Sequence, residues 1–411
     1  MTTSPRRSVW TAVLCWLTVL LEGYDLVALG ATIPTLLKTH HLGFTAAGAT
    51  LVATVSLIGV AVGAACVGPI TDRFGRRGML IGSVLLFSVF TLVTPLAPSV
   101  AVFAVLRFVA GLGLGACMPV ALTTMSEHLP EHRRASASTV TMTGYHVGAV
   151  LTSVLALSAG TDNWHLLFYG GGTVGLLVVP VMWWKLPESA AFLAAKQEPA
   201  AEKIGLRDLL GARYRRTSLL VWTGSFMGLL LVYGLNTWLP QLMRTAGYPI
   251  STSVTLLLVL NAGGVLGLLV AGAVADRFGI KPVAVLWFGA GALLLAALSM
   301  RIGSSLLLNL VVLLTGVFVF SAQVLIFGYV AKTFPANARG TALGLTSAIG
   351  RLGSILGPFV TGALVTAGIA YPWGFWFFAA VAVLGLLAML FVAGRVRTAG
   401  TAIVEEQPVG A

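Results

Sequence analysis

The stretch that decides the fold is Gly68-Pro-Ile-Thr-Asp72-Arg-Phe-Gly-Arg-Arg77, because a version of it recurs later in the chain. A related stretch, Gly272-Ala-Val-Ala-Asp276-Arg-Phe-Gly-Ile-Lys281, lies 204 residues further along. Each copy directly follows a long apolar segment and ends in basic residues. A polar motif repeated between apolar segments indicates a chain that crosses a membrane several times and contains an internal duplication.

The composition is that of a membrane protein. Of the 411 residues, 57% are hydrophobic and 9% are charged, whereas soluble domains carry about 25% charged residues. A soluble domain has no means of hiding so much apolar surface. Crossing a bilayer takes roughly 20 apolar residues, and twelve segments meet that length. They lie near 10–37, 44–70, 78–96, 100–125, 135–159, 164–186, 217–243, 250–275, 282–301, 304–331, 340–368 and 372–394.

The basic residues are distributed unevenly between the two sides of the membrane. With both termini in the cytoplasm, 20 of the 25 Lys and Arg residues fall in inside segments. Only Lys38, Arg244 and Arg301 fall outside, and Arg107 and Arg351 lie within spans. Cytoplasmic loops attract Lys and Arg, so the sequence predicts an N-in, C-in topology. The net charge of +12 is therefore a topology signal, and we expect no nucleic-acid partner.

The two halves of the chain correspond at further positions. At offsets of 205 or 206 residues the matching pairs are Pro34 with Pro240, Lys38 with Arg244, Pro130 with Pro335, and Arg134 with Arg339. We therefore predict an all-α membrane protein of two pseudo-symmetric six-helix bundles, residues 1–186 and 217–394. A cytoplasmic linker, 187–216, joins them and contains an amphipathic helical segment at Ile204–Leu210, and a cytoplasmic tail spans 395–411. Duplicated bundles with a substrate site at their interface are typical of alternating-access transporters.

Two acids lie inside the first apolar segment, where a charge is costly. Glu22 and Asp25 are three residues apart, which puts both on one face of a helix. Acids at membrane depth usually face a cavity and handle protons, ions or substrate. Low dielectric favours a neutral carboxyl group, which then takes up and releases a proton near neutral pH. We expect Asp25 and Glu22 to carry the proton; the alternative is that one of them only neutralises a buried arginine.

Three basic side chains lie within the spans. Arg351 stays protonated and offers a planar fork that matches a carboxylate, so we expect it to anchor an anionic substrate; a buried ion pair is the alternative. At the repeat offset of 205 residues His146 corresponds to Arg351, so both side chains are expected to face a central cavity. An imidazole there would bind the substrate or share the proton, although a lone histidine is more often a packing residue. Arg107 either belongs to the proton path with Asp25 or only braces its helix against the first one.

Aromatic and amide side chains within the spans are candidates to flank a flat substrate, although packing between helices is their default role in membranes. The substrate-site candidates beside the three cations are Tyr24, Tyr145, Asn236, Trp238 and Gln323, and Tyr233 and Asn261 belong to the same group of side chains. The sequence contains no nucleophile constellation, metal-spaced His/Cys cluster or phosphate loop. We therefore expect no enzymatic activity, no metal and no cofactor.

The repeated motif has a separate expected role at the cytoplasmic helix ends. Charges there are predicted to bridge the ends of neighbouring helices and to favour the outward-open state of a transport cycle. A shift from 1:99 to 99:1 takes only about 5.5 kcal/mol. The predicted gating residues are Asp72, Arg73, Arg76, Arg77, Glu127, Arg134, Asp276 and Arg339. Lys332 stands where the first half has Glu127, so the two networks are not copies.

These motifs carry a resemblance to a known family. Gly68–Arg77 resembles the signature between helices 2 and 3 of the major facilitator superfamily, and Arg107–Gly115 resembles its helix 4 pattern. The segment Pro187-Glu-Ser189 resembles the end of helix 6 in sugar porters. Within the superfamily, Glu22-Gly-Tyr-Asp25 is similar to the Asp-Gly-(Phe/Tyr)-Asp element of the aromatic acid:proton symporters, with Glu in place of the first Asp. Tyr233–Pro240 and Ile349–Pro358 resemble helices 7 and 11 of the same symporters.

The resemblance implies a proton-coupled transporter that imports a small organic anion, namely an aromatic carboxylate such as benzoate or hydroxybenzoate. The expected partners are that anion, the proton and the lipid of the cell (inner) membrane, and we expect the protein to act as a monomer. The alternative is a proton-driven exporter of drugs or aromatic compounds. Exporters of this superfamily often carry Gly-x-x-x-Gly-Pro in helix 5, whereas Ala149 follows Gly144-Tyr-His-Val-Gly148 here.

Overall fold

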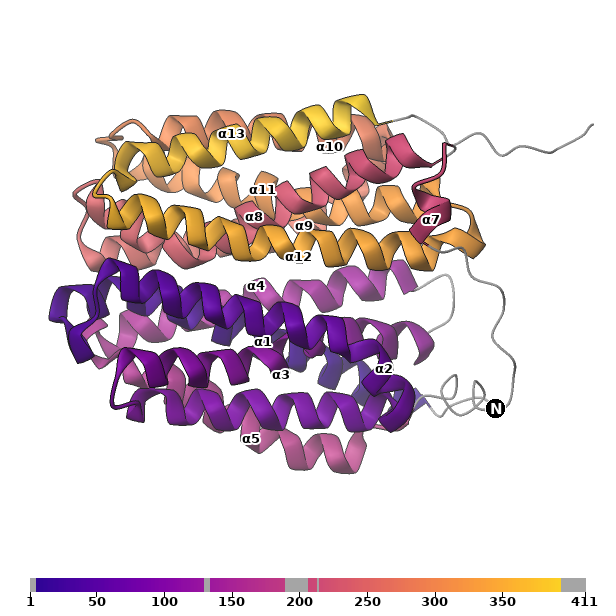
Figure 1. The fold of residues 1–411 in the computed structure, drawn as a ribbon, viewed down its shortest axis with the longest axis horizontal. Helices are drawn as coiled ribbons and strands as arrows, with labels where there is room; N and C mark the ends of the chain where they lie inside the picture. The colour runs from indigo at the N-terminus through magenta and orange to yellow at the C-terminus, as the bar shows by residue number, and fades with distance from the viewer. Residues whose placement is uncertain (1–4, 129–133, 189–205, 213, 393–411) are drawn as a thin grey trace, which may run out of the picture.

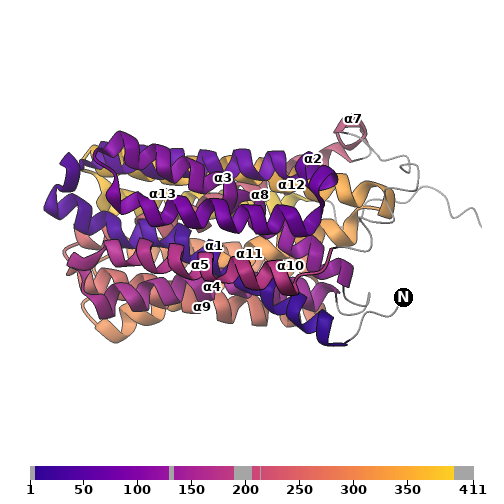
Figure 2. The same cartoon turned by 90° about the horizontal axis from the view of Figure 1, so that it is seen from below.

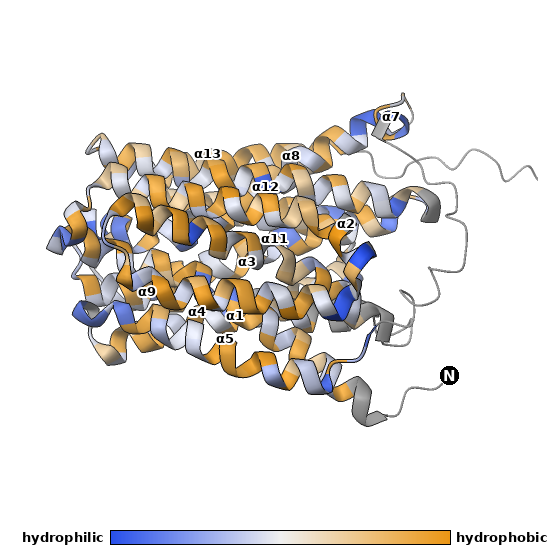
Figure 3. Cartoon of the chain, turned by 60° about the horizontal axis from the view of Figure 1, so that its bottom comes forward, coloured by the Kyte–Doolittle hydropathy of each residue, from blue (hydrophilic) through white to orange (hydrophobic). Residues whose placement is uncertain are grey.

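The computed structural model describes residues 5–128, 134–188, 206–212 and 214–392. Every regular element within those ranges is helical, as predicted. Twelve of the described helical segments are long and apolar enough to cross a membrane, which confirms the predicted number of spans. The long helices run along a common direction (Figures 1 and 2), and hydrophobic residues cover most of their length (Figure 3).

The helices form two groups, one above the other in Figure 1. The first group contains α1 (Pro5–Thr39), α2 (Ala46–Val93), α3 (Val100–His128), α4 (Arg134–Ala159) and α5 (His165–Lys185). The second contains α8 (Arg215–Thr245), α9 (Ile250–Phe278), α10 (Ile280–Leu298), α11 (Ser305–Thr333), α12 (Ala336–Thr366) and α13 (Ala370–Phe391). The short helix α7 (Leu206–Leu209) lies in the predicted amphipathic segment of the linker, and three 3-10 turns are η1 (His41–Gly43), η2 (Thr94–Leu96) and η4 (Thr161–Asn163).

Helix α2 contains the span Ala46–Val67 and, with η2, forms the span Arg73–Leu96, and the repeated motif joins the two spans. Instead of a loop, the two spans are joined by a kink at Gly75, whose φ is 83°, and helix continues on both sides of it. In the second half Gly279, with φ 89°, separates α9 from α10 at the matching position. Side chains rarely tolerate this left-handed region, whereas glycine adopts it freely. The duplication seen in the sequence is therefore present in the backbone as well.

The turn at Gly75 is held by the end of the first bundle. The Glu188 carboxylate accepts the backbone N–H groups of Arg76 and Arg77 at 2.9 and 3.2 Å, which are among the unpaired donors of a helix start. The Arg77 guanidinium also donates to the Trp183 carbonyl and lies 5.6 Å from the centroid of the Trp183 ring. The segment after α5 is thus tied to the repeated motif.

The gating role of the charged residues stays a prediction. Asp276 pairs with Lys332 at 3.5 Å in an exposed position of the second bundle, and Arg339 is exposed. Arg73 lies over the ring of Phe74, 5.3 Å from its centroid. The side chains of Asp72, Glu127 and Arg134 lie outside the part that the structure describes.

The two bundles meet along three helix pairs, α1 with α8, α2 with α12, and α4 with α9. Every residue is buried from Thr18 to Leu36 on α1 and from Leu230 to Met243 on α8. Nearer to their N-termini the same helices expose large side chains such as Val13 and Leu219. The bundles are therefore packed together over the end at which α1 and α8 finish.

Candidate functional site

Asp25 and Arg107 form an ion pair inside the first bundle. Arg107 donates through Nη2 to Asp25 Oδ2 at 2.7 Å and through Nη1 to Oδ1 at 3.1 Å. Thr91 Oγ1 donates to Asp25 Oδ1 at 2.6 Å, and the guanidinium lies 5.6 Å from the centroid of the Phe168 ring. Both charges are thus compensated by groups of α1, α2, α3 and α5, which is the geometry of a buried brace between helices.

Glu22 lies three residues earlier on the same helix and has a different environment. Its side chain is fully buried, and neither carboxyl oxygen has a hydrogen-bond partner among the described residues. The Met118 backbone lies close but outside hydrogen-bond geometry, and the Arg351 guanidinium is near enough for electrostatic interaction. An isolated ionised carboxylate is costly to bury, whereas a neutral one costs far less. The environment is suited to a carboxyl group that holds a proton in this conformation.

Arg351 reaches the centre of the molecule from α12 of the second bundle. Its side chain is 8% exposed, and Nη1 donates to the Tyr233 hydroxyl at 3.2 Å. No described carboxylate lies within salt-bridge distance of it. Its charge is therefore available to an anion, with which a guanidinium forms two parallel hydrogen bonds.

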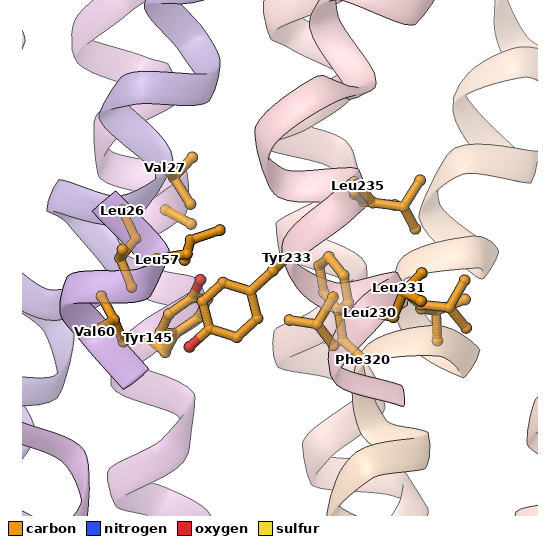
Figure 4. Packing of buried hydrophobic residues seen from close by; sticks show 14 of the residues in the cluster. Leu26, Val27, Leu57, Val60, Tyr145, Leu230, Leu231, Tyr233, Leu235 and Phe320 are labelled. Carbon is orange, nitrogen blue, oxygen red and sulfur yellow. The ribbon is translucent and has the colours of Figure 1, made fainter. Parts of the chain in front are cut away.

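A small pocket lies between the bundles beside Tyr233. Figure 4 shows the rings of Tyr145 and Tyr233 next to each other in this region, and their centroids are 6.3 Å apart at an interplanar angle of 60°. Apolar walls with a few polar groups are typical of small-molecule sites, and the two rings suit a flat ligand. The residues that line the pocket are Leu26, Leu29, Ala53, Ser56, Leu57, Tyr145, Tyr233, Asn236 and Thr237.

His146 links the two bundles through a chain of side-chain hydrogen bonds. Its Nδ1 lies 2.9 Å from Asn261 Oδ1, and Asn261 Nδ2 donates to Asn236 Oδ1 at 2.8 Å. Both amide orientations follow from backbone acceptors, because Asn261 Nδ2 also donates to the Leu257 carbonyl and Asn236 Nδ2 to the Val232 carbonyl. His146 Nδ1 is therefore the donor toward Asn261. The imidazole stacks on Phe320 with centroids 4.7 Å apart.

The remaining predicted side chains are used within a bundle. Tyr24 donates its hydroxyl to the Leu167 carbonyl at 3.0 Å, between α1 and α5. Trp238 Nε1 donates to the Pro358 carbonyl at 2.8 Å, between α8 and α12. Gln323 Nε2 donates to Ser225 Oγ at 2.9 Å, and its own Oε1 is buried without a described partner. None of these three side chains lines the central pocket.

Several site residues carry no recognisable signal in the sequence. Thr91, Phe168 and Ser56 belong to residue types that are common in membrane spans and do not repeat between the halves. Only the packing of α2 and α5 against α1 and α3 brings the first two to the Asp25–Arg107 pair. Tyr233 is among the aromatic candidates, and its position between Arg351 and Tyr145 follows from the packing of α8.

Two bundles of membrane-spanning helices with a pocket between them are the architecture of a class of protein, the secondary transporters. The family model described as "Major Facilitator Superfamily" matches residues 15–358 and 262–410. The chain belongs to this superfamily. It is accordingly a multi-pass membrane transporter and not an enzyme, and proteins of this kind lie in the inner membrane in bacteria.

Curated relatives match nearly the whole chain, and they confirm the resemblance to aromatic acid transporters. A gentisate transporter from Corynebacterium glutamicum is 34% identical over 390 residues, which cover 93% of this chain and 87% of that protein. A gallate transporter from Pseudomonas putida is 32% identical, covering 88% of this chain and 86% of the relative. The 4-hydroxybenzoate transporter PcaK of Pseudomonas putida is also 32% identical, with coverage of 88% and 87%.

Solved structures show the same fold at low sequence identity. A D-xylose–proton symporter superposes with a TM-score of 0.76 at 18% identity, covering 95% of this chain and 98% of that one. A variant of the nucleoside transporter NupG has a TM-score of 0.74 at 17% identity, with coverage of 94% and 99%. The predicted two-bundle membrane fold is thereby confirmed.

Proposed function

We propose that the protein imports an aromatic carboxylate together with protons by alternating access. The substrate class is supported by the gentisate, gallate and 4-hydroxybenzoate transporters to which the chain is similar over most of its length. The coupling rests on one observation, the contrast between the two acids of α1. Asp25 is fully paired with Arg107, whereas Glu22 is buried with no hydrogen-bond partner among the described residues and lies near Arg351.

The proposed cycle assigns the proton to Glu22 and the substrate carboxylate to Arg351. An ionised Glu22 and an anionic substrate would compete for one guanidinium in a site of low dielectric. Protonation of Glu22 removes this competition, so that the substrate binds Arg351 with its ring against Tyr233 and Tyr145. The site then holds the ion pair of Arg351 and the substrate carboxylate beside a neutral Glu22. It closes at low cost in free energy, because no uncompensated charge is buried. Release of both ligands on the other side completes the coupling.

The orientation of the conformation follows from the predicted topology. With the N-terminus inside, α1 and α8 both finish on the outer side of the membrane. The end at which the bundles are packed together is then the outer one. We assign this conformation to the part of the cycle in which the site is closed to the outside.

Transport by purified protein in proteoliposomes tests the proposal. An inward proton gradient is expected to drive accumulation of radiolabelled 4-hydroxybenzoate by the wild type. Glu22→Gln is neutral at every pH, so we expect at least about a tenfold loss of gradient-driven accumulation. Exchange of internal for external substrate should persist, because Arg351 and the pocket are unchanged. Asp162→Asn makes the same chemical change at an exposed carboxylate in η4 and should behave like the wild type.

Two outcomes would contradict the proposal. Undiminished gradient-driven accumulation by Glu22→Gln would exclude Glu22 as the coupling acid. Absence of uptake of any aromatic acid, together with gradient-driven extrusion of dyes, would make the protein an exporter.

A further inference from the structure

Two hydroxyl groups on the wall of the central pocket have no hydrogen-bond partner. Ser56 on α2 is 2% exposed and Tyr145 on α4 is 4% exposed, and neither hydroxyl is paired within the described residues. Other hydroxyls in the spans, such as those of Thr50 and Thr152, donate to a carbonyl one turn earlier in their own helix, whereas those of Thr54, Ser88 and Ser218 are unpaired within the described residues but do not line the pocket. Burying a hydroxyl unpaired costs about 1–3 kcal/mol. Two such groups in one pocket indicate a polar ligand group that pairs with them.

The two hydroxyls lie in the same pocket as Tyr233, the hydrogen-bond partner of Arg351, although Arg351 does not itself line the pocket. Tyr233 accepts the hydrogen bond of Arg351 and also lines the pocket with Ser56 and Tyr145. A ligand whose carboxylate binds Arg351 therefore extends past Tyr233 toward the other two side chains. Figure 4 shows Leu26 and Leu57 on the side of the first bundle, next to the Tyr145 ring. These apolar walls suit a ring, and the two hydroxyls suit a polar substituent on it.

We propose that Ser56 and Tyr145 form a subsite that binds a ring hydroxyl of the substrate, so that these two side chains set the preference for a hydroxylated ligand over benzoate. The inference rests on the proposed function, in which Arg351 binds the carboxylate. A serine or tyrosine hydroxyl both donates and accepts, as a phenolic hydroxyl does. Benzoate leaves the two protein hydroxyls unpaired, and a site that loses such hydrogen bonds discriminates against the analogue that lacks the hydroxyl.

Competition between ligands that differ by one hydroxyl tests this subsite. Inhibition constants of benzoate and of 2-, 3- and 4-hydroxybenzoate are measured against uptake of radiolabelled 4-hydroxybenzoate. We expect at least one hydroxybenzoate to bind about fivefold more tightly than benzoate, as one net hydrogen bond provides. Ser56→Ala and Tyr145→Phe should each reduce that ratio about three- to fivefold, because each weakens the hydroxylated ligand more than benzoate.

Thr54→Ala is the matched control. Thr54 lies on the same helix and its hydroxyl is also buried without a described partner, but it does not line the pocket. Its variant should keep the wild-type ratio. Equal constants for benzoate and all three hydroxybenzoates, or an unchanged ratio in Ser56→Ala, would overturn the subsite and leave aromatic acid import intact. Failure of every aromatic acid to compete would overturn the proposed function, and the subsite with it.

Discussion

The two acids of α1 are expected to respond differently to the same isosteric change. Asp25→Asn removes the charge that compensates Arg107 and leaves a guanidinium buried. Breaking such a pair costs about 3–5 kcal/mol, so we expect a lower melting temperature in detergent and loss of transport together with folded protein. Glu22→Gln removes a group without partners and should melt close to the wild type. Thermal unfolding followed by fluorescence measures both variants.

A second substitution separates the structural role of Asp25 from a role in the proton path. The double variant Asp25→Leu/Arg107→Leu removes both charges, and replacing a buried pair by apolar side chains is often neutral for stability. We expect this variant to regain the melting temperature and part of the transport activity. Recovery of stability without any transport would place Asp25 in the proton path after all, and an Asp25→Asn protein that melts like the wild type would show that the pair is no brace.

The positions of the charged residues were predictable from the sequence, but their pairing was not. Burial of Glu22, Asp25, Arg107 and Arg351 follows from span length, since each lies near the middle of an apolar segment. Arg107 pairs with Asp25 because of the way α1 and α3 are rotated relative to each other. Thr91 on α2 adds a hydrogen bond to the Asp25 carboxylate. Such long-range contacts leave no periodic trace in the sequence.

The chain His146–Asn261–Asn236 connects α4 of one bundle to α9 and α8 of the other. Asn261→Leu leaves two buried polar side chains without this partner, so we expect a loss of about 1–3 kcal/mol in stability for each. In His146→Leu/Asn261→Leu an apolar pair replaces the first link, which should recover part of that loss. Because His146 is paired and does not line the pocket, we expect transport by the double variant to recover to within about threefold.

The same double variant tests the alternative role of His146. Stability that recovers while transport stays absent would mean that the imidazole handles the proton or the substrate. Melting temperature and uptake are therefore measured on the same preparations. Gln323→Leu provides a comparison, since it removes a polar link within one bundle and should lower stability without loosening the contact between the bundles.

At the level of helices, local properties of the sequence were sufficient for the spans and insufficient for their connections. Apolar length predicted all twelve spans, because burial in lipid requires it of each helix separately. The repeated polar motif predicted the separation of the two spans of α2, and the kink at Gly75 lies within it; the motif did not show that helix continues up to the kink on both sides. Tyr24 and Trp238 donate hydrogen bonds to backbone carbonyls of other helices. Because every residue has a backbone carbonyl, the sequence does not show which one accepts the bond.

Transport by the whole molecule requires the two bundles to come together and to part, and Gly30 lies where they touch. A Cβ atom at Gly30 would be 2.2 Å from the Asn236 carbonyl oxygen on α8. Both groups belong to helix backbones and cannot yield cheaply. Gly30→Ala is therefore expected to keep the outer end apart and to lower uptake by at least about tenfold. Gly82→Ala is the control, because a Cβ there meets nothing within 4 Å.

A measurement of substrate binding distinguishes a Gly30→Ala protein whose transport cycle is blocked from one whose binding site is damaged. Substrate binding at equilibrium in detergent should fall much less than uptake, because a Cβ at Gly30 would meet Asn236 and Thr237 on one wall of the pocket, whereas Arg351 and Ser56 are not among its nearest neighbours. Both uptake and exchange should fall, since each requires the site to change sides, and the proton gradient should make no difference. Wild-type uptake by Gly30→Ala would show that this contact does not form during transport. Loss of binding with loss of uptake would assign Gly30 to the integrity of the site, whereas binding without exchange is the result that only alternating access explains.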